Sequence, residues 1–356
     1  MGPLGGCRQR ADGIGEPRGL RQTAAVCQGN RQSGIEGVAG LGGVDGLDRK
    51  PGDMGFPLLL NDKSPVSPRF YTLTTKQSRL IGLIIADITN PFYPALTRSV
   101  QDVCNSAGYD VFLCNTDEKT SLVRRYIDNL CQKQVDGIIL QAFTHKDLEA
   151  VEVIKKAGIE VVLISCSNNT SLTTVYTNET NGAYLATRHL LDIGHQKIAF
   201  LSGPKSYNVS ALRLKGYKKA LLEAGIEPAE QYVCYADFNQ SGGEEMARKI
   251  LEVRPHPTAI FAANDLIALG VIQHFEKCQI RIPQDIALVG FDDIEMARLV
   301  RPKLTTIANP KYELGQTAAQ QLISRILDPA QPNRRVVLDT RLVLRDSSLI
   351  RQEALL

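Results

Sequence analysis

The sequence lacks the features that mark a membrane protein, an exported protein or a thiol-based metal site. No apolar run approaches the ~20 residues of a membrane-spanning helix, and the N-terminus has no charged flank followed by an apolar segment. The eight cysteines form no CxxC pair, and several lie in strand or helix patterns as small buried apolar residues. We therefore predict a protein of the reducing cytoplasm that does not contact a membrane.

Catalytic and cofactor motifs are also missing. There is no HExxH, no paired Cys/His spacing and no GxSxG, so we predict no metal and no hydrolase activity. The glycine-rich stretch Gly37–Gly46 has no preceding apolar strand, no GxGxxG spacing and no Lys-Ser/Thr ending. We expect no cofactor and no enzyme on a Rossmann-like sheet. The net charge of +3 is too small to indicate a partner.

The N-terminal part differs from the rest of the chain. Of the 29 glycines, 15 precede Phe56, and helical or alternating periodicity is almost absent there. We predict that residues 1–71 form a low-complexity or disordered segment.

What is present after Leu80 is a repeated pattern in which an amphipathic helix ends at a glycine and a β-branched run follows. The three copies are SAGYDVFLC, KAGIEVVLIS and DIGHQKIAFLS, with Gly108, Gly158 and Gly194 as left-handed helix ends. Because the following runs are nearly continuously apolar, each strand needs cover on both faces. The pattern predicts an α/β fold with parallel sheets flanked by helices, whose ligands bind at the carboxyl ends of the strands.

The segment after the first strand is a candidate binding loop. Leu80–Ile85 reads as a buried strand, Asn90 as an N-cap and Pro91 as the first helical residue. The segment Asp87–Tyr93 would then lie at a strand's carboxyl end, where free N–H groups favour a polar ligand. A capped surface turn is the alternative.

Further polar side chains follow strand-like runs at the same predicted edge. They are Asn115, Asp117, Gln141, Arg213, Asn264, Asp265, Asp292 and Asp293. Arg213 offers a planar donor fork for vicinal hydroxyls or a carboxylate, and Asp292 can accept from two hydroxyls. In the alternative, Arg213 is a solvated helix residue, Asn264 and Asp265 cap a helix, and Asn115 forms a turn.

His189 and His195 lie where a helix runs into a glycine. A hydrogen bond at the helix end or a packing role is more typical there than catalysis.

Several segments resemble the effector-binding core of the lactose-repressor/galactose-repressor (LacI/GalR) family of bacterial transcription regulators. They begin with LTTKQSRLIGLIIADITNPFYPALTRSVQDVCNSAGYDVFLCNTDE from Leu73. They continue in order with VDGIIL, NGAYLATRHLLDIGHQKIAFLSGP, RLKGY, TAIFAANDLIALG, IALVGFDD, LTTI and RLVLRDS. Each motif alone is weak evidence for the family, but the order and spacing of all of them are specific to it.

The resemblance implies a two-lobed, periplasmic-binding-protein-like (type I) core with three crossover strands and an effector in the cleft. We expect residues 80–177 plus 308–335 in the first lobe and 178–307 plus 336–356 in the second. The helical segment Tyr312–Leu327 is expected to return to the first lobe. The family's effector-contacting arginine and aspartate match Arg213 and Asp292, and its pocket aromatic matches Phe238. The resemblance also favours ligand contacts for Asn90, Phe92 and Tyr93.

Two departures from the family pattern concern the effector. Ser165 and Cys166 stand where an aspartate and an arginine are common, and Asn178 and Glu179 replace the usual aspartate-asparagine pair. The effector class therefore does not carry over from relatives. Aromatic faces beside carboxylate and guanidinium groups suit a hydroxylated ligand, and we prefer a sugar or sugar acid.

A third departure concerns DNA binding. The family carries a helix-turn-helix and a short hinge helix before the core, but residues 1–71 show no recognition-helix pattern. Residues 72–79, beginning near Leu73, resemble the distal end of the hinge. Our hypothesis is that a DNA-binding module is encoded upstream and lost through a frameshift, a sequencing error or a wrong start. A genuine alternative N-terminus is the competing explanation.

The leading functional prediction is a cytoplasmic, ligand-responsive transcription regulator, acting as a homodimer on operator DNA. We expect it to act as a repressor, and activation is the alternative that the sequence leaves open. The alternatives are a solute-binding protein for sugar transport, which an export signal would favour, and a stand-alone small-molecule sensor without DNA binding.

Overall fold

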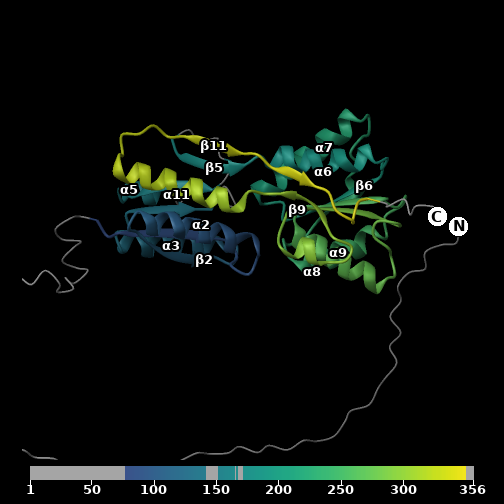
Figure 1. Cartoon of the computed structure of the whole chain (residues 1–356), viewed down its shortest axis with the longest axis horizontal. Coiled ribbons are helices and arrows are strands. Elements are labelled where there is room, and N and C mark those ends of the chain that lie inside the picture. Colours follow the sequence, from purple (N-terminus) through teal and green to yellow (C-terminus); the bar gives the residue numbers. More distant parts are fainter. Residues whose placement is uncertain (1–76, 142–150, 165, 167–170, 350–356) are drawn as a thin grey trace, which may run out of the picture. The chain divides into compact units, whose positions relative to one another are not determined.

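The computed structural model describes residues 77–141, 151–164, 166 and 171–349. These residues form two lobes, each built around a six-stranded sheet with helices on both faces (Figure 1). The predicted hinge residue Leu73 and the predicted low-complexity segment 1–71 lie outside the described residues. Among the helices described, none combines the length and the apolar character that a membrane crossing requires.

The first lobe has an all-parallel sheet whose central strands are buried on both faces. Its strands in spatial order are β11 (Arg335–Leu338), β5 (Thr173–Thr177), β4 (Glu160–Ile164), β3 (Gly137–Leu140), β1 (Leu80–Ile85) and β2 (Asp110–Asn115). Its helices are α2 (Phe92–Ser106), α3 (Thr120–Gln132), α5 (Val151–Lys156) and α11 (Lys311–Leu327). One apolar cluster joins α2 and α11 to one face of the sheet, and another joins α3 and α5 to the opposite face.

The second lobe has the same plan, with one antiparallel strand at its edge. Its strands in spatial order are β12 (Arg341–Val343), β10 (Thr305–Ala308), β9 (Ala287–Asp292), β8 (Ala259–Ala262), β6 (Ile198–Ser202) and β7 (Val233–Tyr235). Its helices are α6 (Glu179–Asp192), α7 (Asn208–Glu223), α8 (Gln240–Ile250), α9 (Asp265–Lys277), α10 (Met296–Leu299) and the short 3-10 turn η1 (Glu230–Tyr232). The pairs α6/α7 and α8/α9 cover opposite faces (Figure 1).

The predicted glycine helix ends are present. Gly108, Gly158 and Gly194 have φ values of 77°, 72° and 99°, and Gly225 ends α7 in the same way at 72°. Residues with a side chain rarely adopt this conformation, so these glycines stop the helix and turn the chain toward the next strand or turn. The predicted parallel α/β architecture is confirmed.

One strand departs from the expectation of cover on both faces. β2 lies at the sheet edge, where Phe112 is 45% and Leu113 is 41% exposed. The apolar run around them is therefore only partly buried within this chain.

The chain passes between the lobes at three places: between β5 and α6, between β10 and α11, and between β11 and β12. The last passage lies later than the predicted boundary at residue 336. β11 pairs in parallel with β5, so residues 336–338 belong to the first lobe. Residues from Arg341 onward join the second lobe through β12. Helix α11 packs in the first lobe, against α2 and strands β3 to β5.

Candidate functional site

A cavity of about 120 Å³ lies where the carboxyl-end loops of the two sheets meet. Eight of the ten residues predicted to bind a ligand line it: Asn90, Phe92, Tyr93, Gln141, Arg213, Phe238, Asn264 and Asp292. The lining also includes residues that the sequence did not single out for ligand contact: Glu118, Ile164, Cys166, Tyr176, Thr177, Glu179, Tyr207, Asn208, Val209, Leu212, Asn309 and Leu314.

The first lobe supplies an aromatic and mostly uncharged wall. The side chain of Asn90 accepts a hydrogen bond from the Phe92 N–H at 3.0 Å, in the turn before α2. The helix starts one residue later than predicted, with Pro91 rather than Asn90 at its N-cap position. The rings of Phe92 and Tyr93 meet edge to face, with centroids 5.2 Å apart. Burial raises the pKa of the Tyr93 phenol despite a hydrogen bond with Gln141, so the group stays neutral.

The second lobe supplies a buried charge network centred on Arg213 of α7. Its Nε donates to Glu179 Oε2 at 2.7 Å, and its Nη2 lies 3.6 Å from Asp292 Oδ1. Nη1 donates to the carbonyl oxygen of Ala263, and the guanidinium stacks 3.8 Å from the ring centroid of Phe291. The side chain is only 6% exposed. Arg213 is therefore a fixed cation inside the protein, contrary to the solvated-helix alternative.

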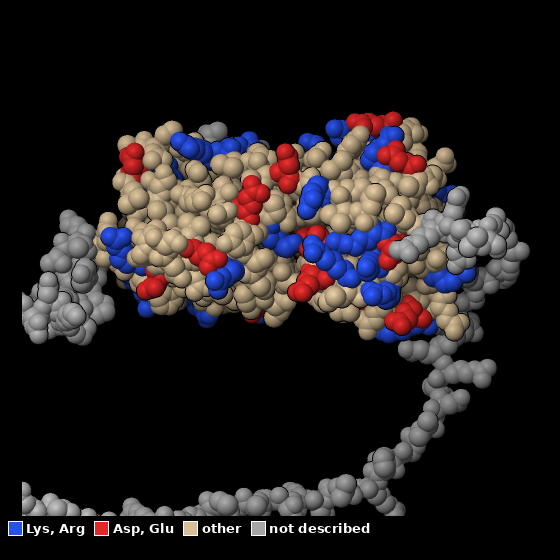
Figure 2. Space-filling model, viewed as in Figure 1, with Lys and Arg blue, Asp and Glu red and all other residues tan. Residues whose placement is uncertain are grey.

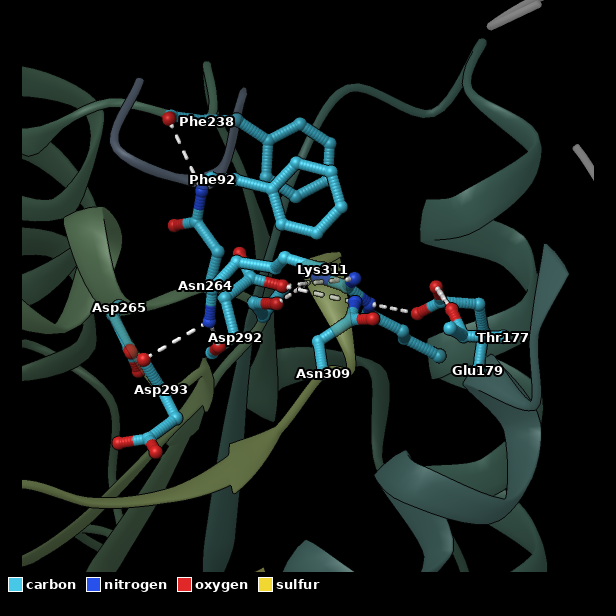
Figure 3. Close-up of polar contacts among 12 residues, drawn as sticks. Phe92, Thr177, Glu179, Phe238, Asn264, Asp265, Asp292, Asp293, Asn309 and Lys311 are labelled. Atoms are coloured by element: carbon cyan, nitrogen blue, oxygen red, sulfur yellow. Dashed lines mark hydrogen bonds and ion pairs between the residues drawn. The ribbon is translucent and has the colours of Figure 1, made fainter. Parts of the chain in front are cut away.

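Asp292 ends strand β9 beside this network (Figure 3). Its Oδ1 accepts from Asn309 at 3.4 Å, while Lys311 donates to the main-chain oxygens of Asp292 and Asp293. Burial raises the pKa of Asp292 to about 6, although Arg213 and Lys311 act to lower it. The carboxylate is thus charged at neutral pH and gains a proton under mildly acidic conditions.

Asn264 caps a helix, as in the alternative, and also lines the cavity. Its Oδ1 accepts from the Ile267 N–H at 2.8 Å and caps α9, while its Nδ2 donates to the Phe238 carbonyl oxygen at 3.2 Å. The rings of Phe238 and Phe92 face the cavity (Figure 3). Gly203 leaves room for Phe238, because a Cβ at Gly203 would lie 2.1 Å from its ring.

The neighbouring aspartates Asp265 and Asp293 do not line the cavity. Asp265 is fully buried and accepts from Thr306 Oγ1 at 2.6 Å and from the Ile294 N–H at 2.9 Å. Burial, followed by repulsion from Asp292, raises its pKa to about 8.

Asp293 points away from Asp292 (Figure 3), toward Arg345 at 2.5 Å and Arg298 at 3.1 Å. Burial acts to raise the pKa of Asp293, but the hydrogen bonds from these two arginines outweigh it, and the pKa falls.

Lys and Arg side chains gather on the second lobe on the face drawn in Figure 2, with carboxylates beside them.

Asn115 and Asp117 are not among the residues that line the cavity. Asn115 accepts from the Ile88 N–H at 2.8 Å and donates to Asp117 at 2.6 Å, which matches the turn-forming alternative. Asp117 and its neighbour Glu118 both have positive φ, at 47° and 60°. This tight turn carries Glu118, rather than Asp117, to the cavity.

Beyond the bonds beside the crossover segments, from Thr177 to Glu179 and from Lys311 to the Asp292 main chain, two hydrogen bonds join the lobes at the cavity. Tyr207 donates to Glu118 Oε2 at 2.8 Å, and Asn208 Nδ2 donates to the Cys166 carbonyl oxygen at 2.7 Å. Tyr207 and Asn208 stand at the start of α7 in the second lobe, whereas Glu118 and Cys166 belong to the first. The sequence around these residues does not predict the contacts, because they depend on how the two lobes are arranged.

The two histidines singled out in the sequence, His189 and His195, form hydrogen bonds. His189 Nε2 lies 2.8 Å from Ser348 Oγ, and His195 Nδ1 lies 2.9 Å from Thr258 Oγ1, which fits hydrogen-bonding roles near a helix end. Across the described residues, no group of three or more His, Cys, Asp or Glu side chains is placed to hold a metal ion.

Two α/β lobes, three passages between them and a polar cavity at their junction define the class of two-lobed small-molecule-binding proteins. A family model described as a periplasmic binding protein-like domain matches residues 187–348. The chain is 36% identical to the ribose operon repressor of Escherichia coli (strain K12) over 278 residues, which are 78% of this chain and 84% of that one. It is 34% identical to the HTH-type transcriptional repressor PurR of Photobacterium profundum, covering 78% and 83%.

A solved structure gives the same result. A LacI family transcriptional regulator from Enterococcus faecium with bound ribose is 33% identical and has a TM-score of 0.69, covering 76% of this chain and 98% of that one. The chain belongs to the LacI/GalR family of transcription regulators.

Proposed function

We propose that this protein is a sugar-responsive transcription regulator, whose two-lobed core binds a small effector and thereby controls binding to operator DNA in the cytoplasm. The observation that carries the proposal is the cavity between the lobes, where Arg213, Asp292 and Asn264 converge beside the rings of Phe92 and Phe238. Aromatic faces with a few fixed polar groups are typical of small-molecule sites, and they suit the alternating apolar and hydroxylated surface of a sugar.

The size of the cavity indicates a small effector. An apolar cavity of ~150 Å³ holds a benzene-sized molecule, and the cavity here measures about 120 Å³. The similarity to a ribose operon repressor and to a regulator with bound ribose favours a pentose among the candidates. The similarity to PurR keeps a purine base as a second class to be tested.

In this proposal, effector binding is coupled to DNA binding through the relative arrangement of the two lobes. Because residues from both lobes line the cavity, a ligand there favours whichever lobe arrangement it binds better. The direct bonds Tyr207–Glu118 and Asn208–Cys166 belong to the arrangement described here. A change in lobe angle would alter the spacing of two DNA-binding heads in a dimer.

We further propose that the protein is a homodimer. The exposed apolar side chains Phe112 and Leu113 on the edge strand β2 offer a surface for a second copy. Phe112→Lys is expected to convert the dimer to a monomer in sedimentation velocity, whereas the exposed Leu222→Lys on α7, in the second lobe, leaves the mass unchanged. A wild-type monomer at micromolar concentration would contradict this part of the proposal.

The effector assignment is tested by calorimetric titration of the full chain with pentoses, hexoses and purine bases. We expect a sugar to bind with Kd at or below about 0.1 mM, and Arg213→Ala or Asp292→Ala to weaken it at least tenfold, which is about 1.4 kcal/mol. Arg188→Ala is the control, because Arg188 forms an exposed pair with Asp192 on α6. Changes below about twofold in both cavity variants would contradict the site.

DNA binding is tested separately. The full chain is incubated with fragmented genomic DNA, and the recovered fragments are sequenced with and without the sugar found above. Enrichment of a pseudo-palindrome that changes with the sugar would support regulation of an operator. No enrichment under either condition would favour the stand-alone sensor.

A further inference from the structure

The positive charge of Arg213 is already balanced within the protein. Glu179 Oε2 accepts from its Nε at 2.7 Å, and Asp292 Oδ1 lies 3.6 Å from its Nη2. The three side chains are 6%, 13% and 7% exposed for Arg213, Glu179 and Asp292. Two carboxylates therefore face one guanidinium at close range, away from water, where electrostatic interactions are strong.

The other charged groups do not restore a positive surface. Glu118 adds a third carboxylate to the lining, so the cavity wall carries three acidic side chains and one arginine. The nearby Lys311 is not among the lining residues, and its ammonium donates to the main-chain oxygens of Asp292 and Asp293. An anionic ligand would thus meet a wall of net negative charge.

The unsatisfied polar atoms of the wall are acceptors. Gln141 Oε1 and Asn309 Oδ1 are buried at the cavity without a hydrogen-bond partner among the described residues. A buried acceptor without a donor costs about 1–3 kcal/mol. Hydroxyl groups supply donors, whereas carboxylates and ionised phosphates supply acceptors. The wall therefore fits a ligand rich in hydroxyl groups.

Glu179 is the residue through which this charge balance is set. Its Oε1 accepts from Thr177 Oγ1 at 2.6 Å and its Oε2 accepts from Arg213, so both oxygens are engaged. It acts on a ligand through Arg213, by cancelling the charge that would otherwise attract an anion. It is also one of the two positions where this sequence departs from the family's usual aspartate-asparagine pair.

We infer that Glu179 is a specificity-determining residue that restricts the effector to uncharged, hydroxyl-rich molecules and excludes sugar acids and sugar phosphates. This inference rests on the proposed function and sharpens its effector class. Of the two classes that the sequence favoured, sugar and sugar acid, it keeps the first.

The test uses two matched pairs of probes with the full chain, D-ribose with D-ribose 5-phosphate and D-glucose with D-glucuronate. Affinities are measured by calorimetry at pH 7.5, where Asp292 is charged. In at least one pair we expect the neutral member to bind at least about tenfold more tightly than the anionic member.

The decisive variant is Glu179→Gln, which removes the charge and keeps the side-chain length. With Arg213 released, the ratio of neutral to anionic affinity should fall by about tenfold or more. Glu245→Gln is the matched control, because Glu245 lies exposed on α8, paired with Lys249 at 2.6 Å; its ratio should equal that of the wild type. Glu179→Asn, which introduces the family's usual residue, serves as a second variant, and thermal unfolding checks that each protein is folded.

The outcomes separate the two proposals. A wild-type preference for the anionic member, or an unchanged ratio in a folded Glu179 variant, overturns the inference and leaves the sugar-responsive regulator standing. No binding of either member of either pair, together with binding of a purine base, overturns the sugar proposal and the inference with it. If no probe binds, the sugar proposal and the inference are likewise both overturned. If neither Glu179 variant folds, the wild-type ratio decides.

Discussion

The two walls of the cavity differ in chemistry, and the difference indicates what each lobe contributes. The first-lobe wall includes Asn90, the rings of Phe92 and Tyr93, Gln141 and Glu118. The second-lobe wall carries Arg213, Glu179 and Asp292, whose mutual ion pairs lie within that lobe, while Thr177 and Lys311 of the first lobe donate to Glu179 and to the Asp292 main chain. A charged network assembled within one lobe keeps its geometry when the lobes move apart. For the proposed sugar effector, the ion pairs that would meet its hydroxyl groups are therefore assembled within the second lobe, and the first lobe would cover it.

The largest effect should come from breaking the second-lobe network. Arg213→Ala leaves Glu179 and Asp292 buried without their cation, and loss of one partner of a buried ion pair typically costs about 3–5 kcal/mol. Urea unfolding measures this loss. Arg188→Ala, which removes an exposed pair, should cost less than about 0.5 kcal/mol. Equal effects of the two variants would show that the network is not preorganised.

A smaller effect is expected at the close contact behind Phe238. Gly203→Ala places a methyl group 2.1 Å from the Phe238 ring, and overpacking of this kind costs about 1–3 kcal/mol. The ring must leave its place in the cavity wall, so sugar affinity should fall as well. The double variant with Phe238→Leu should recover part of the stability, as a double-mutant cycle would measure. Purely additive losses would mean that the two positions are not coupled.

The pH dependence of stability should reveal the buried carboxyl of Asp265. Its pKa is raised to about 8 in the folded protein, above its ordinary value of 3.8, so between these pH values the folded state keeps a proton that the unfolded state loses. The free energy of unfolding therefore falls as pH rises from about 4 to 8. The variant Asp265→Asn cannot ionise there. Over this pH range its free energy of unfolding should therefore fall less than that of the wild type, by at least about 1.4 kcal/mol, the equivalent of one pKa unit. Urea unfolding at pH 5 and pH 8 measures this change. An equal change in the wild type and in the variant would contradict the prediction.

The smallest effect concerns the bond between the walls. Tyr207→Phe removes the hydrogen bond to Glu118, which is worth about 0.5–1.5 kcal/mol, and should weaken sugar binding by roughly two- to tenfold with little change in unfolding. Tyr312→Phe is a matched control, because Tyr312 donates to Asp102 at 3.0 Å within the first lobe. An unchanged affinity in Tyr207→Phe would show that the walls do not cooperate through this bond.

The fold was readable because its determinants are local. Gly108, Gly158 and Gly194 mark helix ends within a few residues, and the apolar strands that follow them reveal a sheet covered on both sides. The boundary at β11 was misplaced because Arg335–Leu338 alternates between exposed and half-buried residues, so its pairing with a distant strand leaves a weak local signal.

The site was only partly readable, because a position at the end of a strand does not determine where a side chain points. Asn115 follows its strand as Gln141 does, yet it closes a turn while Gln141 reaches the cavity. Glu179 was noted in the sequence only as a departure from the family pattern. Its contact with Arg213 could not be predicted, because the two residues lie on different helices. Tyr207 and Glu118 meet only when both lobes are assembled, and nothing near either residue predicts that meeting.

The interleaved lobes also have a consequence for the order in which the chain is made. The first lobe begins the described part of the chain, yet its hydrophobic core includes Leu314, Ala318 and Leu322 of α11. Its sheet gains β11 beside β5, and the bond between Arg334 and Thr173 spans 161 residues. On the ribosome, part of the apolar surface of this lobe therefore stays uncovered until most of the second lobe has emerged. Of the two lobes, the one whose synthesis starts first is therefore completed only after most of the other has been made.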